Sequence, residues 1–407
     1  MFKNIEPFLK SFGPGFITAS VVLGPGSIAV SSSIGSSYGY TLLWLIVIAA
    51  VSMMTYVSMS ARYGVTHKES ILTTIANTYG RWFAVLIGIA AFITSSSFQF
   101  GNNLGVGLAM KEITGVNAVL WPVVFTGLAI ILIFWTNNLY KVLEKIMMAM
   151  VIIMILAFFV NLFFVKPNLG QVAKGFIPAS PLSGQLNKMT ALVATTFALG
   201  GALYQSYLVQ NKGWGAEDLK NGMRDAKTGI FMLALISSMI LITSAAALHP
   251  LGIEVHSAAD MIIQLENLFG EAAKYIFSVG LSAAAFSSLV VSPVIGAGLF
   301  SDGLGIGKSM NERMPKFIAA FILLLGMSIA VFFRGNTIYA LILAQSTTLL
   351  GVPLIALGMI LVLNNKKVMG KYRNNLIQNI FAVIGFILIC TMVYFTYVRI
   401  VTTIGNL

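Results

Sequence analysis

The stretch FITASVVLGPGSIAVSSSIGSSYG, residues 16–39, is long and apolar enough to cross a bilayer as a helix. Its centre reads Gly24, Pro25 and Gly26. Proline lacks a backbone donor and glycine adds backbone freedom, so a continuous helix is not expected there. The stretch therefore predicts a membrane span that is interrupted at mid-membrane.

A second stretch, ALVATTFALGGALYQSYLVQ (residues 191–210), carries Gly200 and Gly201 at its middle. Its place along the chain corresponds to that of the first stretch if the protein is built from two halves of five spans each. An odd number of spans per half turns the second half upside down relative to the first. Interrupted helices at corresponding positions of such inverted halves indicate the substrate site of a secondary transporter.

Composition agrees with a membrane protein. Of 407 residues, 57% are hydrophobic and only 9% are charged, and the mean hydropathy is +0.89. A soluble protein of this length could not cover its surface with so few charges. The net charge of +12 comes from short Lys and Arg clusters between apolar runs, which argues for a lipid bilayer as partner and against nucleic acid.

Eleven stretches qualify as spans because each has roughly 20 mostly apolar residues. They cover residues 14–36, 40–60, 82–109, 117–136, 143–165, 188–210, 228–248, 273–301, 317–333, 337–364 and 377–401. We interpret 1–407 as a single transmembrane domain with one repeat over 14–165, an inverted repeat over 188–364 and an extra helix over 377–401.

The distribution of basic residues predicts the orientation. In the eleven-span arrangement most Lys and Arg fall on the side of the N-terminus, and the other side holds only Lys111, Lys166, Lys174, Lys188, Lys274, Arg334 and Arg399. The positive-inside rule then places a multi-pass protein in the cell membrane with a cytoplasmic N-terminus and an external C-terminus.

Several motifs, in this order and spacing, resemble one known family. They are GPGFITAS (13–20), MSARYGVTHKESI (59–71), KVLEK (141–145), SYLVQ (206–210), AAAFSS (283–288) and LAQSTTLLGVP (343–353). Together they are similar to the NRAMP divalent-metal transporters from Gly13 through the tenth span. The resemblance implies an all-α integral membrane protein with the LeuT-type fold, a 5+5 inverted repeat plus an eleventh helix. It also implies a transporter that is no enzyme and needs no cofactor.

The metal ligands of that family are missing at the matching positions. The family signature Asp-Pro-Gly-Asn in the first span reads Gly24, Pro25, Gly26 and Ser27 here, and Met-Pro-His-Asn in the sixth span reads Ala198, Leu199, Gly200 and Gly201. Carboxylate, amide, imidazole and thioether groups are thereby lost, and thioethers are the ligands that favour softer transition metals. We therefore predict no bound metal at these positions.

The family's proton route is altered in the same way. Its third-span Asp and Glu correspond to Gln99 and Asn102, and its sixth-span His corresponds to Gln205. Each replacement keeps a polar side chain and discards the titrating group. Coupling to protons by the family route is thus not expected.

The remaining groups suggest a different cargo. A dehydrated divalent cation at the bilayer centre needs anionic ligands to offset its desolvation. Neutral side chains such as Ser27, Gln205 and Gln345 instead suit a small neutral or zwitterionic organic solute. Residues predicted to contact it are Gly24, Pro25, Gly26, Ser27, Ala198, Leu199, Gly200, Gly201, Gln205, Gln345, Gln99 and Asn102.

Two alternatives remain open at this point. One keeps a divalent metal as substrate, partly hydrated and held by carbonyl and amide oxygens. The other is a membrane sensor or structural subunit that does not transport, although no appended signalling domain is evident. For a coupling ion the sequence favours sodium over the proton, because Ala284, Ser287 and Ser288 in the eighth span resemble the sodium-site arrangement of LeuT-type carriers. Uncoupled facilitated transport is equally open.

Overall fold

The computed structural model describes residues 13–136, 155–156, 158–178, 185–333 and 335–405. Within these ranges all regular structure is helical and no strand occurs. The first helices are α2 (Pro14–Val22), α3 (Pro25–Tyr38), α4 (Leu43–Thr66), α5 (Ile71–Tyr79), α6 (Arg81–Thr114), α7 (Leu120–Trp135) and α9 (Leu169–Gly175). They are followed by α10 (Leu186–Thr196), α11 (Leu199–Lys212), α12 (Leu219–Ala247), α13 (Ala258–Phe269), α14 (Ala273–Leu304), α15 (Arg313–Phe332), α16 (Thr337–Thr347), α17 (Val352–Asn364), α18 (Lys366–Met369) and α19 (Leu376–Gly405). Short 3-10 turns are η2 (Ala216–Asp218), η3 (His249–Leu251), η4 (Gly270–Ala272), η5 (Thr348–Gly351) and η6 (Gly370–Tyr372).

The predicted spans can be compared with these helices. In the described part of the chain, eight helical stretches are long and apolar enough to cross a membrane, and the pair α2 and α3 makes a ninth if it counts as one span. Helix α7, at the predicted fourth span, is apolar but shorter. The predicted fifth span, 143–165, lies mostly outside the described residues. The prediction of an all-helical membrane protein is confirmed.

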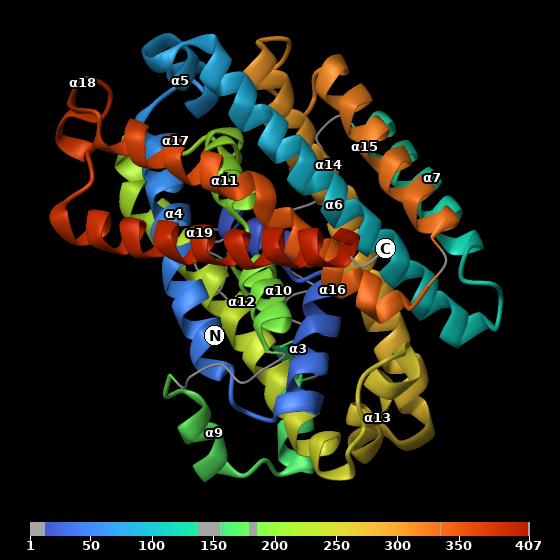
Figure 1. The fold of residues 1–407 in the computed structure, drawn as a ribbon. Helices are drawn as coiled ribbons and strands as arrows, with labels where there is room; N and C mark the ends of the chain where they lie inside the picture. Colours follow the sequence, from blue (N-terminus) through green and yellow to red (C-terminus); the bar gives the residue numbers. More distant parts are fainter. Residues whose placement is uncertain (1–12, 137–154, 157, 179–184, 334, 406–407) are drawn as a thin grey trace, which may run out of the picture.

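The interrupted spans occupy the interior of the bundle. Every residue of the most apolar window within Leu186–Lys212 is buried, whereas only 22% of the corresponding window of Leu376–Val398 is buried. Figure 1 shows α19 running across the outside of the bundle, with α5 and α18 toward one end and α9 and α13 at the other. The broken helices are therefore shielded by the other helices, and α19 faces the surroundings.

Helix α2 is held against α12 by contacts that only glycine permits. A Cβ atom at Gly229 would overlap the carbonyl group of Gly15, so the two backbones touch directly, as small residues allow in membrane helices. Next to this contact the buried carboxylate of Asp225 accepts hydrogen bonds from the backbone N–H groups of Gly13 (2.8 Å) and Gly15 (2.6 Å). A carboxylate at the N-terminus of a helix satisfies donors that the helix itself leaves free. Asp225 thus positions the first half of the broken span.

Candidate functional site

The first interruption lies where the sequence predicted it. Helix α2 ends at Val22, α3 begins at Pro25, and their axes are bent by 57°. Gly24 is in an extended conformation and serves as the N-cap of α3. Pro25 occupies the first helical position, where the missing N–H costs nothing because that group has no partner within a helix.

The break exposes carbonyl groups of α2 that serine hydroxyls then cover. Ser288 Oγ of α14 donates toward the carbonyl oxygens of Ser20 (3.3 Å) and Val21 (3.1 Å). Ser27 Oγ donates across the break to the carbonyl oxygen of Val22. All these groups are buried, so the hydroxyls replace the helical donors that the interruption removed.

The second interruption is displaced from its predicted position. Helix α10 ends at Thr196 and α11 begins at Leu199, so the break falls at Phe197 and Ala198, and Gly200 and Gly201 lie in the first turn of α11. The predicted interruption of the sixth span is therefore present, but it lies at the start of the predicted stretch 198–201 and not at the glycine pair.

The cause of the displacement is tertiary packing. The Phe197 side chain is fully buried, and its ring packs against Tyr56 of α4 with centroids 5.5 Å apart. A Cβ atom at Gly385 of α19 would lie only 3.1 Å from the same ring. The backbone leaves the helix at Phe197, whose side chain is anchored in the core. Gly200 and Gly201 have no side chain that could anchor the backbone in the same way.

Four half-helices meet at the two breaks. Helices α10 and α3 are in contact, and so are α11 and α2. The N-termini of α3 and α11 bring free N–H groups and partial positive charge to the centre, while the C-termini of α2 and α10 bring carbonyl groups and partial negative charge. The centre therefore presents opposite partial charges with no ionised side chain at either break.

A chain of amides in α6 ends beside the first break. Gln99 Nε2 donates to the carbonyl oxygen of Leu289 (2.9 Å), and Asn102 Nδ2 donates to Gln99 Oε1 (2.8 Å). Because a carbonyl can only accept, this chain determines the orientation of both amides. It leaves Asn102 Oδ1 buried without a partner, 3.1 Å from where a Cβ atom at Gly24 would lie. Both the nitrogen and the oxygen of the Gln99 amide are thus hydrogen-bonded, and Asn102 offers a free acceptor to the break.

Gln345 of α16 covers the first turn of α3. A Cβ atom at Gly26 would overlap the Gln345 amide, and Oε1 of that amide is buried without a partner. Pro25 packs against α6, where a Cβ atom at Gly105 would overlap its ring. Glycine at these positions permits both close approaches.

The sixth span contributes Gln205, which the structure joins to the first span. Thr18 Oγ1 donates to Gln205 Oε1 (2.6 Å), and Gln205 Nε2 is buried without a partner. Thr18 was not among the predicted site residues. Thr18 lies four residues, about one helical turn, before the end of α2. A hydroxyl this close to the predicted break was the feature of the sequence that could have identified it.

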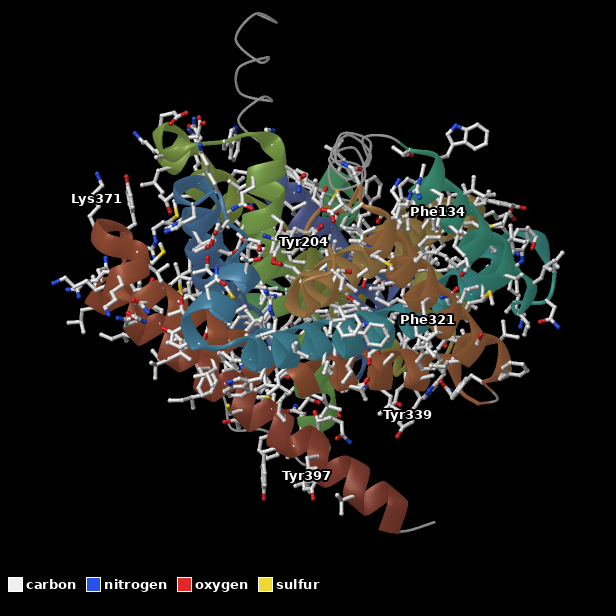
Figure 2. The ribbon with its side chains drawn as sticks, turned by 90° about the horizontal axis from the view of Figure 1, so that it is seen from above. Phe134, Tyr204, Phe321, Tyr339, Lys371 and Tyr397 are labelled. Atoms are coloured by element: carbon white, nitrogen blue, oxygen red, sulfur yellow. The ribbon has the colours of Figure 1, made fainter. Side chains whose placement is uncertain are left out.

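Empty space lies beside the second break. A Cβ atom at Gly200 would meet no atom within 4 Å outside the local backbone, although the residue is buried, whereas one at Gly201 would touch Thr18 Cγ2 at 3.5 Å. Leu199 is fully buried, Ala198 is 5% exposed, and Thr196 Oγ1 has no partner. Figure 2 shows Tyr204, one turn further along α11, in the middle of the bundle.

The predicted sodium-site residues divide into two groups. Ser288 lies against α2, as described above. Ser287 Oγ donates to the carbonyl oxygen of Ala284 (2.8 Å) within its own helix, as serines in membrane helices commonly do. In the described part of the chain no three His, Cys, Asp or Glu side chains lie close enough together to hold a metal ion.

Solved structures with the same overall fold belong to transporters. A manganese transporter of Eremococcus coleocola, in complex with an aromatic bis-isothiourea substituted compound, matches 96% of this chain and 86% of its own at 16% identity, with a TM-score of 0.78. The nucleobase-cation-symport-1 family transporter Mhp1, in a closed conformation with bromovinylhydantoin, matches 95% and 90% at 14% identity (TM-score 0.59). MhsT in complex with L-phenylalanine matches 94% and 97% at 14% identity (TM-score 0.58).

These likenesses confirm the LeuT-type fold that the sequence predicted. The family assignment rests on the sequence itself, because the model of the natural resistance-associated macrophage protein-like (Nramp) family matches residues 15–399. That range spans nearly the whole chain and includes both interrupted helices. The chain therefore belongs to the Nramp family of membrane transporters.

Proposed function

We propose that this Nramp-family transporter carries a small neutral or zwitterionic organic solute bound between the two breaks. The observation that carries the proposal is the set of buried neutral polar atoms without partners: Asn102 Oδ1, Gln345 Oε1, Gln205 Nε2 and Thr196 Oγ1. Leaving such atoms unpaired costs about 1–3 kcal/mol each, so they favour a ligand with matching donors and acceptors.

The half-helix ends support a zwitterion in particular. The N-termini of α3 and α11 would stabilise a carboxylate, and the carbonyl ends of α2 and α10 would stabilise an ammonium group. The solved structure of MhsT, which contains L-phenylalanine, shows that a protein of this fold can bind an amino acid. The space beside Gly200, where the family signature has His, would admit a side chain.

Thermal unfolding of the purified protein tests this assignment. A panel of amino acids and small neutral amides should include a compound that raises the unfolding temperature saturably, whereas manganese chloride should produce no saturable shift. Asn102→Ala should weaken the response to the active compound by roughly tenfold, since one good hydrogen bond in a buried site contributes about 1.4 kcal/mol. Saturable stabilisation by manganese that Asn102→Ala abolishes would overturn the proposal.

Substitutions at Gly200 provide a graded test of the empty space. Gly200→Ala should fold normally and bind the solute with little change, because its Cβ atom meets nothing within 4 Å and alanine favours a helix. Gly200→Leu should fill the space and weaken binding at least tenfold without unfolding the protein. Equal solute affinity of the two variants, measured by the same unfolding assay, would show that the space is not part of the binding site.

One observation favours a second candidate, a divalent metal carried in partly hydrated form. Asn102 Oδ1 and Gln345 Oε1 are oxygen atoms without partners, and amide oxygens can coordinate cations. The structurally similar Eremococcus protein is a manganese transporter. We rank this candidate second because neutral oxygens alone offset little of the cost of desolvating a doubly charged ion.

For coupling we propose sodium rather than the proton. Gln99, Asn102 and Gln205 cannot titrate, so the proton route of the family signature has no ionisable group at these positions. Ser288 Oγ lies by the carbonyl oxygens of Ser20 and Val21, to which it donates, and hydroxyl and carbonyl oxygens are suitable ligands for a monovalent cation.

The two serines of the eighth span make a matched pair for testing sodium coupling. Ser288→Ala should raise the sodium concentration for half-maximal uptake into proteoliposomes about tenfold, which corresponds to one lost contact of about 1.4 kcal/mol. Ser287→Ala should have no such effect, because its hydroxyl is bonded to its own helix. Normal uptake by Ser288→Ala at every sodium concentration would remove sodium as the coupling ion.

We further propose that the end of the bundle with α5 and α18 faces the cytoplasm. Lys and Arg residues gather in the connections and helix ends there: Lys68, Arg81, Lys212, Lys220, Arg224, Lys366, Lys367, Lys371 and Arg373. The positive-inside rule assigns such an end to the cytoplasmic side of the cell membrane.

A further inference from the structure

A groove of about 200 Å³ opens on the outer surface of the bundle between α4, α12 and α19. Its walls include Val51, Ile377 and Phe381, whose apolar side chains are exposed. Figure 1 shows α19 passing α4 on this side, and the two helices are in contact. In a bilayer this groove would be open to lipid rather than to water.

Two buried polar atoms of α4 lack partners, one on a residue that lines the groove and one on Arg62, which bonds to the lining residue Gln378. Ser58 lines the groove and is 6% exposed, and its hydroxyl has no hydrogen-bond partner in the described part of the chain. One turn further along α4, Arg62 is 7% exposed, and its Nε atom also lacks a partner. Arg62 Nη1 donates to Gln378 Oε1 (2.7 Å) and Nη2 to Asn374 Oδ1, so both recorded partners are neutral amides. A buried guanidinium without an anion is costly, which favours an anion nearby.

Positive charge continues along α12 at the same end of the groove. Lys220, Arg224 and Lys227 are exposed and follow one another at helical spacing, so they form one stripe. Lys227 itself lines the groove. Lys227 thus brings one end of the stripe into the groove, and Arg62 is joined to the groove through its bond to the lining residue Gln378.

The dimensions match one acyl chain in one leaflet. From Val51 to Arg62 the α4 helix rises about 16 Å, at about 1.5 Å per residue, which is close to half of a hydrocarbon core about 30 Å thick. On α4 the apolar wall residue Val51 lies farther from the end of the helix than Arg62, and the cations lie toward the end of α4 and the first part of α12. Ser58 lies about 6 Å deeper than Arg62, at the depth expected for the ester groups of a lipid.

We propose that the groove between α4, α12 and α19 is a binding site for an anionic phospholipid. The phosphate group lies by Lys227 and Arg62, Ser58 donates to an ester carbonyl, and an acyl chain packs against Val51 and Phe381. Basic pockets between membrane helices are suited to anionic headgroups. This site is independent of the proposed solute, because none of these residues belongs to either break.

Thermal unfolding of the purified full-length protein with added lipid tests the proposal. Dioleoylphosphatidylglycerol in detergent micelles should stabilise the protein at a lower concentration than dioleoylphosphatidylcholine, and inorganic phosphate should not stabilise it. Lys227→Gln should raise the half-saturating phosphatidylglycerol concentration about fivefold, as expected for one basic residue at the membrane surface, and leave the response to phosphatidylcholine unchanged. Ser58→Ala should weaken both lipids by the same factor, because both carry ester groups.

Lys371→Gln is the matched control. Lys371 is an exposed basic residue at the same end of the molecule, does not line the groove, and lies at the periphery in Figure 2. Its replacement should not change the response to phosphatidylglycerol. Equal stabilisation by the two lipids, stabilisation by phosphate alone, or equal losses in Lys227→Gln and Lys371→Gln would each overturn the proposal.

Discussion

Gly26→Ala should reduce solute uptake at least tenfold while the protein still folds. Gly26 has no positive φ, so alanine is compatible with its backbone, but the new methyl group would overlap the Gln345 amide. Gln345 is 1% exposed, and displacing it should cost about 1–3 kcal/mol of unfolding free energy as an overpacked core does. Uptake into proteoliposomes and thermal unfolding measure the two effects.

A second substitution identifies the cause of that loss. In the double variant Gly26→Ala with Gln345→Ala the clash is absent, so the double variant should be no less stable than Gln345→Ala alone. Gly127→Ala is the control for adding a methyl group to a membrane helix, since its Cβ atom would meet nothing within 4 Å. Strictly additive losses of stability would contradict a direct clash between Gly26 and Gln345.

Asp225→Asn should lower the unfolding free energy by about 2–4 kcal/mol. The substitution keeps the shape of the side chain but replaces one oxygen with an NH2 donor, so one of the N–H groups of Gly13 and Gly15 loses its acceptor and faces a donor instead. Each bond to a buried charged group contributes about 1.5–3 kcal/mol, and the carboxylate also stabilises the N-terminus of α2. Denaturation of the detergent-solubilised protein gives the difference.

The matched control for Asp225 is Glu217→Gln. It removes one negative charge from the exposed turn that precedes α12 and should change stability by less than about 0.5 kcal/mol. If Asp225→Asn is as stable as the unchanged protein, the carboxylate does not hold α2 against α12.

Local chemistry made much of the fold predictable. Long apolar runs must be helical in a bilayer because every backbone group needs a partner there, so the spans could be predicted from composition. The first break was located correctly because Pro25 lacks a donor in any surroundings. That positions 99 and 102 carry amides follows from the sequence itself, and the resemblance to the family implies that they stand where the family has ionisable groups.

Contacts between distant segments decided the rest. The second break lies at Phe197 because its ring is anchored by Tyr56 and α19, and no local signal marks that residue. Thr18 joins the site through Gln205, which is far away in sequence.

Arg62 shows the same division at the surface of the bundle. The sequence alone predicted a cation, Arg62, just after the span 40–60, whereas the structure continues α4 to Thr66 and includes Arg62 in the helix. Only the tertiary structure brings to this cation the neutral amides of Asn374, just before α19, and Gln378, in its first turn. The physical reason is that backbone hydrogen bonding is satisfied within a few residues, whereas partners of buried side chains depend on how whole helices pack.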